Sequence, residues 1–279
     1  MTVLVFDSGI GGLSVLREAR LVLPGHRIVY IGDDAGFPYG DWEEQSLTAH
    51  MVALFERFIE QFSPDLAIVA CNTASTLIMP ALRQRFNIPF VGIVPAIKPA
   101  AELTASGLIS VLATPGTIAR RYTQRLVEEF ASHVEVNLVG ATRLARMAEH
   151  HMQQIPIELE ALREEIAPCF IEKDSRRTDI VTLGCTHYPF LVSQMRKVAP
   201  WPVDWIDPAE AVARHAASLL GPQGEVLAEP GVAVSTEPGD LAIMTSGNPP
   251  AAIVRLLSGA GLMTGRGQAI RTPHNRRSR

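Results

Sequence analysis

The chain has 279 residues, of which 47% are hydrophobic and 19% are charged, and its formal net charge is -4. This composition supplies enough apolar material for a folded core, which excludes disorder over most of the chain. The negative net charge gives no reason to expect a nucleic-acid partner. No apolar run approaches the ~20 residues that a membrane helix needs, so no membrane association is expected. Residues 1–7 lack the basic segment of a signal peptide and are predicted to form a strand.

The numbers of cysteines and lysines limit the classes of enzyme that the chain could be. The three cysteines are an odd number, which disfavours a disulfide framework and favours a reducing, cytoplasmic setting. Lysine occurs only as Lys98, Lys173 and Lys197. Few lysines are therefore available to form a Schiff base, which disfavours a pyridoxal-dependent enzyme.

Short apolar runs alternate with amphipathic stretches along the chain. Because these runs are apolar throughout, they predict an α/β protein with mainly parallel sheets that are flanked by helices. The predicted strands are Val3–Phe6, Ile28–Ile31, Leu66–Ala70, Phe90–Val94, Ile109–Ala113, Val134–Val139, Ile180–Leu183, Val203–Ile206, Val232–Ser235 and Leu241–Thr245. The predicted helices include Ala49–Gln61 and Thr117–Phe130.

Two of the strand–turn segments occur twice. The strand that ends at Asp7-Ser8 has a counterpart that ends at Thr114–Gly116. The strand that ends at Cys71–Thr73 has a counterpart that ends at Cys185–His187, at nearly the same offset along the chain. Two matched pairs predict two related, pseudo-symmetric α/β halves.

Proline-containing segments mark the crossings between the halves. Val94–Pro99 is the expected first crossing, and Asp207-Pro208 has the capping pattern of a helix that starts the return. We therefore place the first domain at residues 1–96 plus 208–264, where the last two strands would rejoin or flank it, and the second domain at 97–207. Residues 265–279 are expected to be a basic, disordered tail.

The repeated cysteines, Cys71 and Cys185, are the most informative residues for function. In open parallel sheets, ligands bind beyond the carboxyl ends of the strands, which is where both cysteines are predicted. Hydroxyl or amide side chains follow each of them, whereas Cys169 stands alone and is interpreted as a buried apolar residue. A cytoplasmic setting disfavours a disulfide between them. Zinc would need a clear fourth ligand, so no metal is expected.

Two thiols on opposite faces of a substrate could interconvert its mirror images without a cofactor. One thiolate would remove an α-proton, and the other thiol would return a proton to the opposite face. Both cysteines are predicted to precede helix N-termini, which favour the thiolate. Asp7 could orient or activate Cys71, or only cap a helix, and His187 could serve Cys185. The side chains that could hold substrate carboxylates are Ser8, Asn72, Thr73 and Thr186.

Other classes of protein remain open at this point. A thiol hydrolase or amidotransferase would use Cys185 with His187 and would leave Cys71 unexplained. A catalytically silent binding protein could keep the fold, although the cysteine pair disfavours it. The turn Gly9–Gly12 lacks the third glycine of a dinucleotide-binding motif, so a nucleotide cofactor is not expected.

Taken together, these segments resemble the glutamate racemases of the cofactor-independent aspartate/glutamate racemase family. The matching segments, in the family's order, are Phe6–Leu16, Pro38–Gly40, Ala70–Ser75, Leu183–Pro189 and Asp207–Ala209. The resemblance implies two α/β domains of similar topology, with the active site in the cleft between them. It also implies interconversion of L- and D-glutamate, no cofactor, a supply of D-glutamate for bacterial peptidoglycan, and a cytoplasmic homodimer.

The resemblance also implies roles for individual residues. Cys71 and Cys185 would be the acid/base residues, assisted by Asp7, by His187 and by a glutamate for which Glu149 is the candidate. The implied substrate contacts are Asp7, Ser8, Pro38, Tyr39, Gly40, Asn72, Thr73, Thr114, Thr117, Thr186 and His187. A relative that acts on aspartate is the nearest enzymatic alternative, and the Asp-Ser-Gly start followed by Gly-Gly-Leu disfavours it.

The loop after the second strand departs from the family pattern. Asp34–Phe37 stands where the family commonly has a Thr-Ala-Arg type of stretch. Asp41-Trp42 follows Pro38–Gly40 in place of a basic or hydroxyl pair. Because this loop would flank the substrate, we expect the departures to affect how tightly and how specifically the substrate binds. Asp41 is expected to face solvent.

Overall fold

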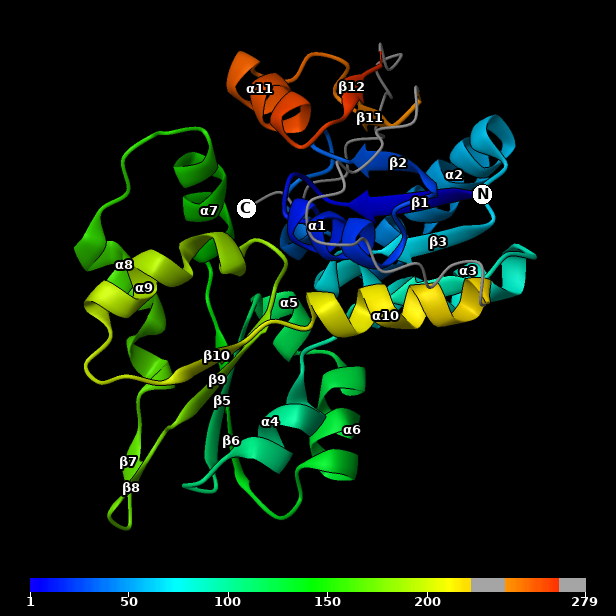
Figure 1. Ribbon diagram of the computed structural model, residues 1–279. Helices are drawn as coiled ribbons and strands as arrows, with labels where there is room; N and C mark the ends of the chain where they lie inside the picture. The colour runs from blue at the N-terminus through cyan, green and yellow to red at the C-terminus, as the bar shows by residue number, and fades with distance from the viewer. Residues whose placement is uncertain (222–238, 266–279) are drawn as a thin grey trace. The chain divides into compact units, whose positions relative to one another are not determined.

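The computed structural model describes residues 1–221 and 239–265. These residues divide into two compact units, each built on its own parallel sheet (Figure 1). Unit 1 contains the described residues of Met1–Ile93 and Ala209–Arg279, and unit 2 is Val94–Pro208. The predicted strand Val232–Ser235 and the predicted tail from residue 266 onward lie outside the described residues. Among those described, no helix combines the length and the hydropathy that crossing a bilayer requires.

Unit 1 is a sheet of six parallel strands in the order β12-β11-β2-β1-β3-β4. The strands are β1 (Thr2–Asp7), β2 (Arg27–Gly32), β3 (Leu66–Val69), β4 (Phe90–Gly92), β11 (Leu241–Met244) and β12 (Met263–Thr264). The helices are α1 (Leu13–Val22), α2 (Glu44–Phe62), α3 (Asn72–Arg85), α10 (Ala209–Leu220) and α11 (Ala251–Gly259), with a 3-10 turn η1 (Tyr39–Asp41). Alternate strand residues such as Leu4 and Phe6 pack against α2 and α3, while α1 and α10 pack together.

Unit 2 is a sheet of four parallel strands in the order β10-β9-β5-β6. The strands are β5 (Leu108–Ala113), β6 (Glu135–Gly140), β9 (Ile180–Gly184) and β10 (Asp204–Ile206). The helices are α4 (Ile97–Leu103), α5 (Pro115–Ile118), α6 (Arg121–Phe130), α7 (Leu144–Met152), α8 (Leu159–Ile166) and α9 (Val192–Val198), with 3-10 turns η2 (Ala167–Cys169) and η3 (Tyr188–Leu191). Helices α4 and α6 cover one face of the sheet, and α7, α8 and α9 cover the other (Figure 1).

The strand orders of the two units correspond. In unit 1, β1 lies between β2 and β3, and β4 follows β3. In unit 2, β5 lies between β6 and β9, and β10 follows β9. The predicted pair of similar, mainly parallel α/β halves is therefore confirmed. The correspondence makes β3 equivalent to β9, and these are the strands that precede Cys71 and Cys185.

One predicted helix is divided in the structure. The stretch Thr117–Phe130 forms the end of α5 and the whole of α6, with a break at residues 119–120. The Thr123 hydroxyl donates to the Thr117 carbonyl at 2.7 Å. Side-chain hydrogen bonds of this kind compete with the helical backbone pattern, so the prediction of one continuous helix was wrong here.

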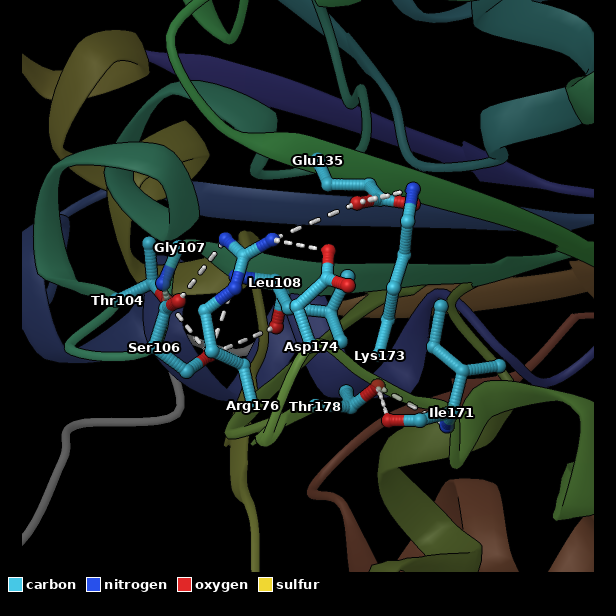
Figure 2. A network of polar contacts seen from close by, with 10 residues as sticks. All are labelled: Thr104, Ser106, Gly107, Leu108, Glu135, Ile171, Lys173, Asp174, Arg176 and Thr178. Carbon is cyan, nitrogen blue, oxygen red and sulfur yellow. Dashed lines mark hydrogen bonds and ion pairs between the residues drawn. The ribbon is translucent and has the colours of Figure 1, made fainter.

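A small antiparallel hairpin, β7 (Glu172–Lys173) and β8 (Arg176–Arg177), projects from unit 2. Figure 2 shows its polar contacts, in which Lys173 pairs with Glu135 at 2.8 Å and Arg176 reaches both Glu135 and Asp174. An open cavity of about 510 Å³ is lined by the hairpin, residues 172–177. The hairpin precedes the amino end of β9, whereas ligands of parallel sheets bind at the carboxyl ends of strands. This cavity is therefore at the wrong end of the sheet for the chemistry predicted from the cysteines.

Candidate active site

In unit 1, polar residues from neighbouring strands meet at the carboxyl edge of the sheet. The parallel register aligns Phe6 of β1 with Val69 of β3, so Ser8 and Cys71 follow aligned residues. The Cys71 thiol donates a hydrogen bond to the Ser8 hydroxyl, with Sγ and Oγ 3.6 Å apart. Cys71 is only 6% exposed. A buried thiol that contacts a hydroxyl at a strand end is positioned to act on a bound ligand.

Helix α3 begins directly after Cys71. Cys71 occupies the N-cap position with extended backbone, and Asn72 and Thr73 form the first turn of the helix. Cys71 therefore precedes a helix N-terminus, as predicted, and the positive end of the helix dipole faces the Cys71 region. Asn72 is 2% exposed, and neither its side-chain oxygen nor its nitrogen has a hydrogen-bond partner among the described residues. Because buried amides are normally satisfied, this side chain is suited to contact a substrate.

Asp7 shapes the turn after β1. Its side chain is wholly buried, and Oδ1 accepts the backbone N–H of Gly9 at 2.9 Å. The Tyr30 hydroxyl donates to the Gly9 carbonyl at 2.8 Å and holds the same turn. The N-cap of helix α1 is Gly12, which has no side-chain cap among the described residues, and Asp7 stabilises the turn that precedes this helix.

The loop Pro38–Gly40 brings one aromatic ring to this part of unit 1. Tyr39 is buried, Pro38 is half-buried, and Gly40 and Asp41 are exposed. Burial raises the pKa of Tyr39, and the charges of Asp33, Cys71 and Asp7 raise it further. The phenol therefore stays neutral and acts as a hydrogen-bond donor. Tyr39 and Cys71 also belong to the same core cluster.

In unit 2, the equivalent strand end carries the second thiol. The register aligns Ala113 of β5 with Gly184 of β9, so Thr114 and Cys185 follow aligned residues. Thr114 caps α5 by accepting the backbone N–H of Thr117 at 3.2 Å, and the two hydroxyl oxygens lie 3.0 Å apart. These two threonines are thus placed on the strand next to the one that carries Cys185.

A carboxylate, an imidazole and the Cys185 thiol form a chain of contacts in unit 2. Glu149 of α7 accepts a hydrogen bond from His187 Nε2 at 2.9 Å. His187 Nδ1 lies 3.8 Å from Cys185 Sγ. Because Nε2 carries the proton toward the carboxylate, Nδ1 can accept the proton of the thiol. The structure thus places Glu149, the glutamate chosen from sequence, beside His187.

The surroundings of Cys185 differ from the prediction in one respect. Cys185 was expected to precede a helix N-terminus, but the 3-10 turn η3 follows and α9 begins only at Val192. Pro189 lies in the first positions of η3 and has no N–H to donate. A helix dipole therefore acts on Cys71 and not on Cys185, where His187 is the neighbouring polar group.

The third cysteine is not part of either thiol site. Cys169 is 0% exposed, and burial raises its pKa far above the usual range. It lies in the core between the sheet of unit 2 and α8. None of the three cysteines forms a disulfide. Within the described residues, no group of three or more His, Cys, Asp or Glu side chains is arranged to hold a metal.

Sequence reasoning missed a buried acid beside the Tyr39 loop. Asp33 directly follows β2 and accepts hydrogen bonds from Tyr39 and from His50 of α2. An aspartate after an apolar strand obeys the same strand-end rule as Asp7. His50 also falls on the helix face of the buried residues Leu47 and Leu54. Both signals were present, but nothing in the sequence showed that the two side chains meet.

The structure is a duplicated parallel α/β unit with one cysteine at the same strand end of each copy, which is the arrangement expected of a racemase that uses two thiols. The model of the Asp/Glu/Hydantoin racemase family matches residues 14–216 of this chain. The chain belongs to this family. It is 56% identical over 261 residues to a glutamate racemase of Mesorhizobium japonicum, covering 93% of this chain and 97% of that relative.

Two further likenesses are of the same kind. A glutamate racemase of Brucella anthropi is 56% identical over 263 residues, covering 93% of this chain and 92% of the relative. The crystal structure of Escherichia coli glutamate racemase, in complex with L-glutamate and the activator UDP-MurNAc-Ala, superposes with a TM-score of 0.83 at 38% identity. That likeness covers 94% of this chain and 96% of the Escherichia coli chain.

Proposed function

We propose that this protein interconverts L- and D-glutamate by cofactor-independent proton transfer that uses Cys71 and Cys185. The observation that carries the proposal is the equivalence of the two thiols, which follow the matching strands β3 and β9 of a duplicated unit. Relatives of this chain at 56% identity over most of its length carry the name glutamate racemase. A substrate whose two forms are mirror images needs an acid and a base that can exchange roles, and two thiols meet that need.

The proposed reaction has two proton transfers. The thiolate of one cysteine takes the α-proton, so that the C–H bond breaks and its electron pair stays on the α-carbon. The thiol of the other cysteine then gives its proton to the opposite face and becomes the thiolate. In the reverse direction the two cysteines exchange roles. The α-proton is a very weak acid, so the site has to stabilise the carbanion with positioned donors while excluding water.

The neighbouring residues support each thiol in a different way. At Cys71, the start of α3 favours the thiolate and Ser8 contacts the sulfur. At Cys185, His187 can take or return the thiol proton, and Glu149 holds the imidazole in the required tautomer. The residues proposed to bind the substrate are Asp7, Ser8, Pro38, Tyr39, Gly40, Asn72, Thr73, Thr114, Thr117, Thr186 and His187.

We further propose a cellular role from the family to which the chain belongs. Racemization of glutamate supplies D-glutamate for bacterial peptidoglycan, and through it for cell-wall biogenesis and cell shape. The thiol chemistry fits a reducing compartment, which supports a cytoplasmic location. We expect the protein to be a homodimer, which sedimentation equilibrium would test.

The activity assay is direct. Purified protein is incubated with L-glutamate and no added cofactor, and circular dichroism follows the loss of optical activity. L-aspartate and a 5-substituted hydantoin are compared at the same concentration. We expect glutamate to racemize, with a kcat/KM at least about a hundredfold above that of the other two. A preference for aspartate or the hydantoin would overturn the substrate assignment within this family.

One observation favours a second candidate function. Cys185, His187 and Glu149 are ordered as the nucleophile, base and acid of a thiol hydrolase or amidotransferase. That function does not need Cys71, so Cys71→Ser would leave it almost intact and an acyl-enzyme would accumulate in a burst. The racemase requires Cys71 and forms no acyl-enzyme.

A further inference from the structure

The Tyr39 loop of unit 1 is held by a buried polar cluster that the reaction itself does not use. At its centre is Asp33, which is 0% exposed. Oδ2 of Asp33 accepts the Tyr39 hydroxyl at 2.6 Å and His50 Nε2 at 2.7 Å, and Oδ1 accepts the Thr245 hydroxyl. Tyr39 comes from the loop, His50 comes from α2, and Thr245 directly follows β11. One carboxylate therefore ties three separate segments together.

His50 is the only basic side chain among the described residues that contacts Asp33. A buried carboxylate needs hydrogen bonds or an opposite charge, because its desolvation is costly. His50 is itself buried, so the pair is shielded from solvent. Among the described residues, removing the imidazole would leave the Asp33 carboxylate with two side-chain donors, the hydroxyls of Tyr39 and Thr245, and would weaken its hold on Tyr39.

The second support of the loop is an aromatic stack. The rings of Trp42 and His50 are stacked, with centroids 4.8 Å apart and an interplanar angle of 28°. The Trp42 indole N–H donates to the Gly36 carbonyl at 2.8 Å. A Cβ on Gly36 would lie 2.3 Å from Asp33 Oδ2, so the loop backbone runs directly against the carboxylate. His50 thus touches both the acid and the tryptophan that fix the two ends of this turn.

We propose that His50 is a positioning residue for substrate binding, which acts through Asp33 and Trp42 to hold Tyr39 and the 36–40 loop beside Cys71. The proposal rests on the proposed function, because it assigns the loop to the substrate of that reaction. His50 transfers no proton in the reaction. Its effect is on how well the loop is formed before the substrate arrives, which contributes to binding affinity.

The test compares three variants of the full-length protein. His50→Leu removes the donor, His50→Gln keeps an N–H that can reach Asp33, and Met51→Leu is the control for disturbance of the buried face of α2. We expect KM for both glutamate enantiomers to rise about tenfold in His50→Leu, with kcat within about threefold of wild type. His50→Gln should restore most of the affinity, and Met51→Leu should have wild-type kinetics. A purely structural role would instead lower the folded fraction, which reduces apparent kcat and leaves KM unchanged.

A second readout does not depend on turnover. Cys71 shares a core cluster with Tyr39, so a loosened loop should expose its thiol. In His50→Leu, alkylation of Cys71 by iodoacetamide, mapped by mass spectrometry, should be about threefold faster or more, while Cys185 in unit 2 keeps its wild-type rate. Unchanged KM together with unchanged Cys71 alkylation would overturn the proposal, as would equal effects in Met51→Leu. Faster Cys71 alkylation in a protein that does not racemize glutamate would refute the proposed function and leave the loop assignment standing.

Discussion

The two thiols have different polar neighbours. Cys71 relies on the backbone at the start of α3 and on the Ser8 hydroxyl, whereas Cys185 relies on the His187 side chain held by Glu149. The backbone N–H groups of a helix start do not gain or lose protons near neutral pH, whereas an imidazole can. The two directions of the reaction should therefore respond differently to substitutions at His187 and Glu149.

The two-thiol assignment makes a prediction for each cysteine. Cys71→Ala and Cys185→Ala should each lower kcat for racemization by at least about 10³-fold, because each removes a general acid or base. Cys169→Ala is the matched control and should keep wild-type kcat, with a loss of about 1 kcal/mol in the free energy of unfolding. Steady-state kinetics and urea unfolding measure both effects. Racemization near the wild-type rate in either active-site variant would refute the two-thiol scheme.

Residue 12 has to be glycine because its backbone lies too close to the Asp7 side chain to leave room for a Cβ atom. A Cβ on Gly12 would lie 2.7 Å from Asp7 Cβ and 3.2 Å from the Tyr30 ring, whereas a Cβ on Gly25 would have no neighbour within 4 Å in the described part of the chain. We expect Gly12→Ala to displace Asp7, to lower activity and to cost about 1–3 kcal/mol of stability. Gly25→Ala should change the free energy of unfolding by less than about 0.5 kcal/mol. Similar effects of the two substitutions would contradict the packing argument.

Among the structural elements, the strands and the polar residues at their carboxyl ends could be predicted from the amino-acid sequence. Apolar runs gave β1, β3, β5 and β9, and their polar ends gave the residues that the structure places at the sheet edges. Local side-chain bonds were less predictable, because the Thr123–Thr117 contact that separates α5 from α6 leaves no periodic signal. The 3-10 turn after Cys185 was missed for a similar reason, since Pro189 is compatible with the first turn of an ordinary helix.

The turn between α4 and β5 is held by one carboxylate of unit 2. Asp179 accepts the Thr104 hydroxyl at 2.6 Å and the backbone N–H groups of Ala105 and Ser106 at 2.8 Å each. Partial burial alone would raise the pKa of Asp179, but the hydrogen bonds from Thr104, Ser106 and Ala105 together lower it. Its contribution to stability is therefore complete above the unfolded-state pKa of about 4 and is lost as the pH falls through the lower folded-state pKa.

This linkage predicts a pH-dependent difference between variants. Asp179→Asn should lower the free energy of unfolding by about 1 kcal/mol at pH 7, because solvent screens this partly exposed carboxylate, and the difference from wild type should shrink as the pH falls below about 4. The control is Asp174→Asn, because the Asp174 side chain is 75% exposed and its partner Arg176 is 3.9 Å away. Urea unfolding at several pH values measures both. A deficit for Asp179→Asn that stays constant down to pH 3 would contradict the role given to the ionised carboxylate.

At the scale of the whole molecule, the duplication was visible in the sequence and the tertiary cluster was not. Two matched strand–turn pairs were enough to predict two similar halves, because strand ends carry conspicuous polar residues. The contacts of Asp33 with His50 and with Thr245 join segments that only the folded sheet brings together. Thr245 is 212 residues from Asp33, and no local pattern reports a pairing at such a distance.

In the proposed mechanism, one group removes the α-proton and a different group delivers a proton to the opposite face. The most direct measurement is racemization of L-glutamate in D₂O, stopped early and analysed by chiral separation with mass spectrometry. Two thiols on opposite faces predict that nearly every molecule of newly formed D-glutamate carries deuterium at the α-carbon, while the remaining L-glutamate carries little. D-glutamate that keeps the original proton would show that a single group serves both faces, and would contradict the two-thiol mechanism.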